Sequence, residues 1–187
     1  IDGVPVSSLS RQNASKAITV TAEDAHIFET TVLENIRVAR GDVTETEAYD
    51  LLDRAGIGEW ARSLPEGLDT VIGSGGTTIS GGERRRILIA RALAATAPLM
   101  LLDEPGEHID PATADKILTE MLTSQSDKGV LVVTHRLSAL GAADEVLMMA
   151  TDGGAAKVVA RGRHQELLAN NEDYAWAACQ EEYAYGN

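Results

Sequence analysis

The fold of this chain is decided by the stretch Thr78-Ile79-Ser80-Gly81-Gly82-Glu83-Arg84-Arg85-Arg86. Ser80 and Glu83 have the spacing of a capping box, so we predict that a helix begins here. Gly81 and Gly82 leave backbone N–H groups uncovered at the helix N-terminus, where an anion can approach closely. A plain capped helix after the glycine-rich loop at residues 73–76 is the alternative at this point. We expect the three arginines on a solvated or acid-paired helix face rather than in a nucleic-acid patch.

Two acids at the end of an apolar run form the second informative stretch, Leu99-Met100-Leu101-Leu102-Asp103-Glu104-Pro105. A buried parallel strand delivers its carboxyl end to the ligand crevice of an open α/β sheet, so both acids are expected to face a site. In a nucleotide hydrolase, Asp103 suits Mg²⁺ and Glu104 suits polarising the attacking water. Two ordinary solvated acids at a strand end are the alternative.

A histidine ends the next apolar run, Val132-Val133-Thr134-His135. Because neighbouring parallel strands end at the same edge of a sheet, we expect His135 to project beside Asp103 and Glu104. An imidazole in that place can hydrogen-bond a terminal phosphate and sense its loss. A lone histidine after a strand is usually structural, so this prediction depends on the order of the three motifs.

The rest of the pattern predicts an α/β domain with a largely parallel sheet, since short apolar strands alternate with capped helices. Helices are expected to begin at Thr31, at Thr44, and at Asp110 before Pro111, and Gly56 is a plausible helix stop. We expect residues 29–95 to be helical, without a strand. The other expected elements are strands at 17–21, 99–102, 130–134, 145–149 and 157–160, a turn at 151–154, and a helix at 173–183.

Charge and composition limit the class of partner. The chain has 187 residues, with 16 Lys and Arg against 29 Asp and Glu, and its formal net charge is −13. Such a balance repels phosphate backbones and argues against a nucleic-acid partner. Cys179 is the only cysteine, which excludes a disulfide within the chain. No apolar run approaches the length of a membrane span, so a membrane-spanning part is expected from another segment or subunit.

The motifs, taken in order, resemble those of the ATP-binding cassette (ABC) ATPases: the signature-like stretch, the acidic strand end, the turn from Glu107 to Asp110, and the strand-end histidine. The resemblance runs from Ile1 to about Leu168. The segments most similar to ABC exporters in particular are residues 1–6, 28–36, 68–73 and 162–168. These matches favour a membrane exporter over the soluble ABC proteins.

The resemblance implies an α/β fold, a RecA-like P-loop NTPase sheet with an inserted ABC α-helical subdomain. Residues 1–28 and 96–187 would form the RecA-like core, and residues 29–95 the helical signature subdomain. The family's phosphate loop, G-x-x-x-x-G-K-[ST], does not occur in the chain. We therefore expect residues outside this numbering to supply that loop and the missing N-terminal part of the sheet. The chain by itself is expected to have negligible ATPase activity.

Roles for individual residues also follow from the resemblance, which implies ATP and Mg²⁺ as ligands. Glu104 would be the general base and His135 the switch. Asp103 would serve Mg²⁺ together with Glu23, which stands where the family usually has glutamine. The signature residues would contact the γ-phosphate of an ATP held mainly by a partner domain. The residues expected at the nucleotide are Ser80, Gly81, Gly82, Glu83 and Asp110.

The resemblance further implies a second nucleotide-binding domain in a head-to-tail dimer and a transmembrane domain, in the same chain or a partner. The ATPase would lie at the cytoplasmic face of the plasma (inner) membrane. Residues 80–86 and 105–110 are similar to the CydC type of subunit. That similarity implies a heterodimer with a CydD-like subunit, exporting cysteine or glutathione for cytochrome bd assembly. The alternatives are an exporter of lipid, drug or peptide, a catalytically degenerate regulatory half-site, and a soluble ABC ATPase of DNA repair or translation.

Overall fold

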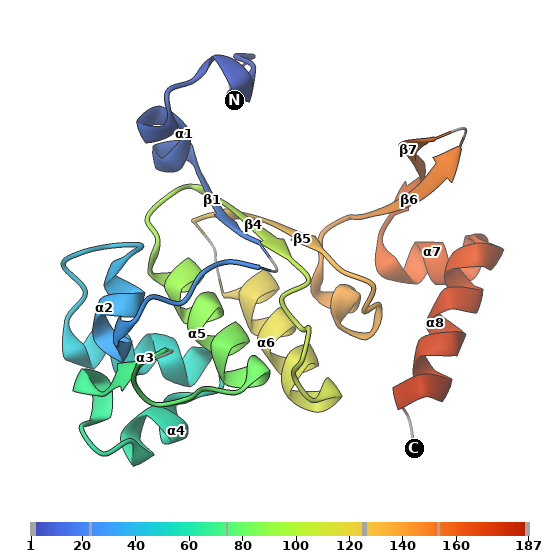
Figure 1. Cartoon of the computed structure of the whole chain (residues 1–187). Coiled ribbons are helices and arrows are strands. Elements are labelled where there is room, and N and C mark those ends of the chain that lie inside the picture. The colour runs from blue at the N-terminus through green and yellow to red at the C-terminus, as the bar shows by residue number, and fades with distance from the viewer. Residues whose placement is uncertain (1–2, 23, 74, 125–126, 153, 186–187) are drawn as a thin grey trace.

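A three-stranded parallel sheet lies at the centre of the computed structural model, which describes residues 3–22, 24–73, 75–124, 127–152 and 154–185 (Figure 1). Its strands are β1 (Ile18–Thr21), β4 (Leu99–Asp103) and β5 (Gly129–Val133), in the order β1-β4-β5. Both neighbouring pairs are parallel. The predicted α/β class with a parallel sheet is confirmed, and these strands lie within one residue of their predicted bounds.

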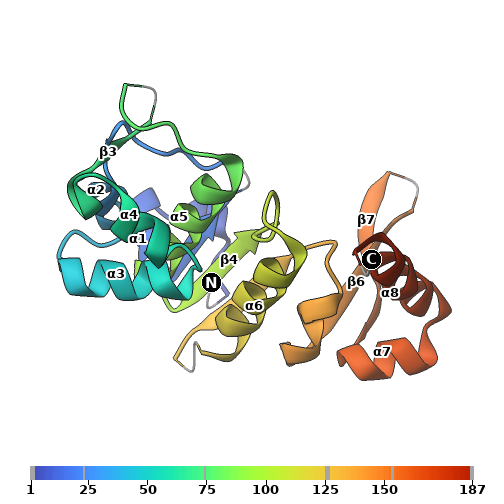
Figure 2. The same ribbon diagram turned by 90° about the horizontal axis from the view of Figure 1, so that it is seen from below.

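One face of the sheet is covered by helices α5 (Gly81–Ala94) and α6 (Pro111–Thr123), as Figures 1 and 2 show. Met100 and Leu102 alternate toward this face, and both belong to the main buried cluster. The same cluster includes Ile87 from α5 and Ile117 from α6. This packing fixes the carboxyl ends of β4 and β5 over the N-terminal end of α6.

The opposite face of the sheet carries an exposed apolar row. The register pairs Val20 with Leu101 and Leu101 with Leu131, so these side chains share one face. Val20 is 60% exposed, Leu131 is 46% exposed, and Val133 is 50% exposed. Neighbouring apolar side chains on a sheet face normally pack against another layer. Asp103 pairs with Val133 in the register and therefore belongs to this same face.

The predicted helix starts at Thr31 and Thr44 and the predicted stop at Gly56 are confirmed among the helices between β1 and β4. These helices are α2 (Val32–Arg37), α3 (Glu45–Arg54) and α4 (Gly58–Ser63), with the 3₁₀ turn η2 (Gly67–Asp69). Thr31 and Thr44 are N-caps whose hydroxyl oxygens accept from the backbone N–H three residues later. Gly56 follows the end of α3 with φ of 71°, a conformation that favours glycine.

The prediction that residues 29–95 contain no strand was wrong. β2 (Thr30–Thr31) pairs antiparallel with β3 (Val71–Ile72), so the chain ahead of α2 is fixed to the segment that leads to α5. Strands of two residues are too short to show an alternating pattern, and burial decides this pairing instead. Ile72 is fully buried in the main cluster.

The described residues ahead of β1 form no strand. Residues 1–2 lie outside the described residues, Gly3 has φ of 79°, and η1 (Val6–Ser8) is a 3₁₀ turn. Helix α1 (Arg11–Ala17) follows and was not predicted. Its N-cap is Ser10, and it has no buried residue, so no apolar periodicity marks it in the sequence.

The C-terminal part forms its own small cluster, to the right in Figure 1. It contains η3 (Ser138–Ala142), the antiparallel hairpin β6 (Val146–Asp152) and β7 (Ala155–Gly162), and helices α7 (His164–Asn170) and α8 (Glu172–Tyr185). Gly154 in the predicted turn has φ of 93°, and Gly153 lies outside the described residues. Within the described residues, no helix has both the length and the apolar character that crossing a membrane requires. The buried members of this cluster are Leu140, Val146, Leu167 and Tyr174.

Candidate functional site

The N-terminus of α5 has the predicted capping box. The Ser80 hydroxyl accepts from the Glu83 N–H at 3.2 Å, and the Glu83 carboxylate accepts from the Ser80 N–H at 2.7 Å. These reciprocal bonds fix the first turn and leave the N–H groups of the two glycines pointing outward along the helix axis. The resulting end of the helix carries a partial positive charge.

The two signature glycines lie against His108. A Cβ atom on Gly82 would come within 2.8 Å of the His108 carbonyl oxygen, which is closer than side chains tolerate. A Cβ on Gly81 would lie 3.5 Å from the His108 Cβ, an ordinary contact. Gly82 is therefore required by the close approach of the loop after β4, while Gly81 is not.

The three arginines after the signature hold backbone segments together, and Arg85 is buried rather than on the expected solvated face. Arg84 donates to the carbonyl of Ala25, and Arg85 is buried with its Nη1 at 3.4 Å from the Asp103 carbonyl. Arg86 donates to the carbonyls of Gly82 and Gly56 at 3.2 and 3.0 Å. A guanidinium satisfies several carbonyls at once, so these side chains join α5 to the surrounding loops.

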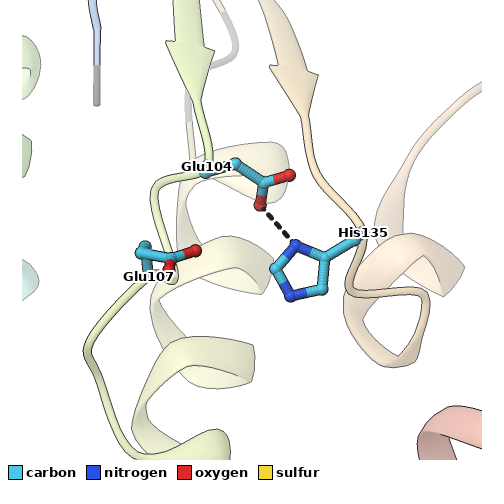
Figure 3. A group of neighbouring side chains, drawn as sticks. All are labelled: Glu104, Glu107 and His135. Carbon is cyan, nitrogen blue, oxygen red and sulfur yellow. Dashed lines mark ion pairs between the residues drawn. The ribbon is translucent and has the colours of Figure 1, made fainter. Parts of the chain in front are cut away.

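At the carboxyl end of the sheet, Glu104 and His135 come together, as predicted (Figure 3). The His135 Nδ1 lies 3.0 Å from Oε2 of Glu104. This contact does not have hydrogen-bond geometry, and Oε2 is buried without a hydrogen-bond partner among the described residues. A buried carboxylate oxygen in that condition is available to a water molecule or a ligand.

Glu107 also lies at this edge, and the sequence did not single it out as a site residue. Ligand atoms of Glu104, Glu107 and His135 all lie within 4.8 Å of one another. The turn after β4 folds Glu107 back toward Glu104, whose N–H donates to the Val133 carbonyl at 2.8 Å. The spacing of three residues after the acidic pair is the signal that could have identified Glu107.

The backbone is strained on both sides of this turn. Glu104 has φ of 45° and His108 has φ of 61°, and neither is a glycine. A non-glycine residue in the left-handed region costs roughly 1–2 kcal/mol. Such strain concentrates at functional sites, because packing there holds a side chain in a direction that the relaxed backbone would not give.

Asp110, predicted at the nucleotide, is the N-cap of α6 in this structure. Its carboxylate accepts from the Thr113 N–H at 3.0 Å. That bond from the Thr113 backbone is the main reason why the pKa of Asp110 is lowered, and the charge of Arg86 contributes. Asp103 ends β4 on the exposed face of the sheet. Glu23, the other predicted Mg²⁺ ligand, lies outside the described residues.

Comparisons with known proteins agree on one family. Residues 1–107 match the family described as ABC transporter. The ATP-dependent lipid A-core flippase of Vibrio cholerae serotype O1 is 37% identical over 176 residues, which are 94% of this chain and 30% of that protein. The flippase of the same name from Haemophilus ducreyi is 37% identical over 175 residues, 93% of this chain and 29% of that protein.

Among solved structures, this chain is similar to a bacterial Atm1-family ABC exporter with ATP bound. The TM-score is 0.83 and the sequence identity is 28%, over 96% of this chain and 31% of that chain. The chain thus spans about a third or less of the length of the proteins it matches. The similarity covers both the sheet and the helices that the sequence placed around the signature.

Proposed function

This chain belongs to the ABC transporter family, and from that membership we propose that it is the distal part of an exporter's nucleotide-binding domain, which hydrolyses ATP to drive transport. The observation that carries the proposal is the meeting of Glu104 and His135 at the sheet edge, where the buried Oε2 of Glu104 has no hydrogen-bond partner among the described residues. The likeness to an ATP-bound exporter supports the same assignment.

We propose a nucleotide with Mg²⁺ as the ligand of this edge. An oxygen donor set of carboxylates suits Mg²⁺, and Asp103, with Glu23, would hold the ion. When bound, Mg²⁺ neutralises charge on the phosphate oxygens. Glu104 would accept a proton from the attacking water through Oε2, which has no hydrogen-bond partner among the described residues. His135, on the neighbouring strand end, would hydrogen-bond the terminal phosphate.

The signature end of α5 would bind the nucleotide of a second domain. Its capping box fixes the first turn, and the N–H groups of that turn would bind an anion. The proposal is a head-to-tail pair of nucleotide-binding domains, in which Ser80, Gly81 and Gly82 of one domain face the phosphate bound mainly by the other. Glu83 supports this surface indirectly by completing the cap.

The exposed apolar row of the sheet supports a larger ATPase core. Val20, Leu131 and Val133 are about half exposed or more, and a further layer of the core would bury them. We propose that residues 1–28 and 96–187 belong to that core and that residues 29–95 form the signature subdomain. A transmembrane domain would complete the exporter, with the ATPase at the cytoplasmic face of the inner membrane.

For the transported substrate we propose a lipid ahead of a thiol. The lipid A-core flippases of two bacteria are each 37% identical to this chain over nine-tenths of its length or more. The alternative hypothesis is a CydC-like subunit with a CydD-like partner that exports cysteine or glutathione. That hypothesis rests on residues 80–86 and 105–110 alone.

Reconstitution of the complete exporter in lipid vesicles tests both the proposed ATP hydrolysis and the proposed lipid substrate. We expect Mg²⁺-dependent ATP hydrolysis that rises when lipid A-core is added to the vesicles. Stimulation by glutathione or cysteine instead would favour the CydC-like alternative. Absence of Mg²⁺-dependent hydrolysis from the intact, folded exporter would overturn the ATPase assignment.

A further inference from the structure

The segment that follows His135 is bound by an acid from the last helix. Oε2 of Glu181, on α8, accepts from the Leu137 N–H at 2.6 Å and from the Ser138 N–H at 3.1 Å. Its Oε1 accepts from the Ser138 hydroxyl at 3.1 Å. A carboxylate that receives two backbone N–H groups at the start of η3 makes charge-assisted bonds, which are stronger than neutral ones.

The same segment is bound on its other side by α6. Arg136 is buried, and its Nη2 donates to Asp115 at 2.7 Å and to the Pro111 carbonyl at 3.2 Å. The Ser138 hydroxyl lies 2.8 Å from the same Asp115 oxygen. Residues 136–138 are thus held between α6 and α8 immediately after His135.

The bonds of Glu181 matter because apolar packing beside them is sparse. A cavity of about 640 Å³ lies among α6, η3, α7 and α8, and Glu181 is one of its lining residues together with Ala178 and Cys179. The buried apolar anchor of α8 is Tyr174, in the C-terminal cluster near the start of the helix. Within the described part of α8, the Glu181 carboxylate supplies the hydrogen bonds that join the later part of this helix to the segment after His135.

His135 itself has little around it that fixes its direction. Its side chain is 59% exposed, and its contact with Glu104 lacks hydrogen-bond geometry. The orientation of the ring must then depend on the backbone that carries it. That backbone continues directly into residues 136–138.

We propose that Glu181 is a positioning residue for the ATPase reaction: by fixing the backbone of residues 136–138, it aims His135 at the sheet edge beside Glu104. The inference rests on the proposed function, because a direction for His135 matters only if the edge holds a nucleotide. It gives the C-terminal helix an indirect part in the reaction, through the backbone of residues 136–138.

The test uses the complete exporter in lipid vesicles, with Glu181→Ala, Glu181→Gln and the control Glu172→Ala, an exposed acid at the start of the same helix. We expect Glu181→Ala to lower kcat about tenfold, the range of a lost charged hydrogen bond, with KM for ATP nearly unchanged. Glu181→Gln keeps one accepting oxygen, so its kcat should fall less than that of Glu181→Ala. The kcat of Glu172→Ala should equal that of the wild type.

A second measurement separates positioning from a general loss of stability. In a His135→Ala background, Glu181→Ala should lower the single-turnover rate of hydrolysis no further, because the residue that it positions is gone. An equal further loss in that background would overturn the inference, as would a Glu181→Ala rate equal to that of Glu172→Ala. Failure of the proposed function looks different, since the wild-type exporter would then hydrolyse no ATP.

Discussion

The N-terminus of α5 and the carboxyl edge of the sheet are built in opposite ways. At Ser80 the polar groups of the helix start are satisfied by the chain itself, through the reciprocal bonds with Glu83. At the sheet edge the backbone of Glu104 is strained, and its buried Oε2 lacks a hydrogen-bond partner among the described residues. The polar groups of the helix start are thus satisfied within this chain, whereas Oε2 of Glu104 is left available to a water molecule or a ligand.

Removing the carboxylate at the edge should have the largest effect on activity. Glu104→Gln keeps the size of the side chain but cannot accept a proton, so turnover should fall by about 10²–10⁴-fold, the usual contribution of a general base. Binding of ATP to the complete exporter, measured by equilibrium titration, should be retained. Glu107→Gln is the matched control, with a smaller effect, and a Glu104→Gln exporter with normal turnover would refute the assigned base.

Substitutions of the two signature glycines test how closely the His108 loop packs on the start of α5, and the test needs no nucleotide. Gly82→Ala places a methyl group 2.8 Å from the His108 carbonyl and should destabilise the protein by about 1–3 kcal/mol. Gly81→Ala meets only an ordinary contact at 3.5 Å and should be neutral or slightly stabilising, since alanine favours helix. Thermal unfolding of the complete protein compares the two. Equal shifts in Tm would contradict the close packing of the loop on this turn.

Substitutions of Ser80 separate the helix cap from the anion-binding role. Ser80→Ala removes the cap and should cost about 1 kcal/mol of stability. Ser80→Asp retains a capping oxygen but adds a negative charge where a phosphate is proposed to bind. We therefore expect Ser80→Asp to unfold like the wild type while losing most ATPase activity. A Ser80→Asp exporter with full activity would show that no phosphate meets this surface.

The smallest expected effect concerns Asp110, where capping is the observed role. Its pKa is lowered by the bond from Thr113, so its stabilising contribution is complete above its ordinary pKa and is lost as the pH falls through the lower, folded value. Asp110→Asn retains a capping oxygen without the titration, and its unfolding temperature should depend less on pH between roughly pH 5 and 2. An unchanged pH dependence would mean that the Thr113 bond does not favour the charged form.

Features encoded by neighbouring residues were predictable from the sequence. Caps at Ser80, Thr31 and Asp110 join groups three residues apart, and the core strands are continuous apolar runs. The pairing of His135 with Glu104 followed from one topological rule, that parallel strands end at a common edge. The sheet edge could thus be assembled from separate local signals.

Features that depend on distant partners were missed. Glu181 bonds to Leu137, 44 positions away in the chain, and the sequence around Glu181 does not predict that partner. The β2–β3 pair is short and held by burial of Ile72, and the carbonyl partners of Arg84 and Arg86 depend on how loops pack around α5. Tertiary packing decides these contacts, and the local sequence pattern does not predict them.

The most direct test places Ser80→Ala and Glu104→Gln in two arrangements of the complete exporter. In one, both changes are in this chain's domain; in the other, Ser80→Ala is in this domain and the change matching Glu104→Gln is in the partner domain. If each signature serves the nucleotide of the other domain, the separated arrangement keeps one intact site and the same-domain arrangement keeps none. We predict single-turnover ATP hydrolysis only when the changes are separated. Hydrolysis only when both changes share one domain would contradict the account.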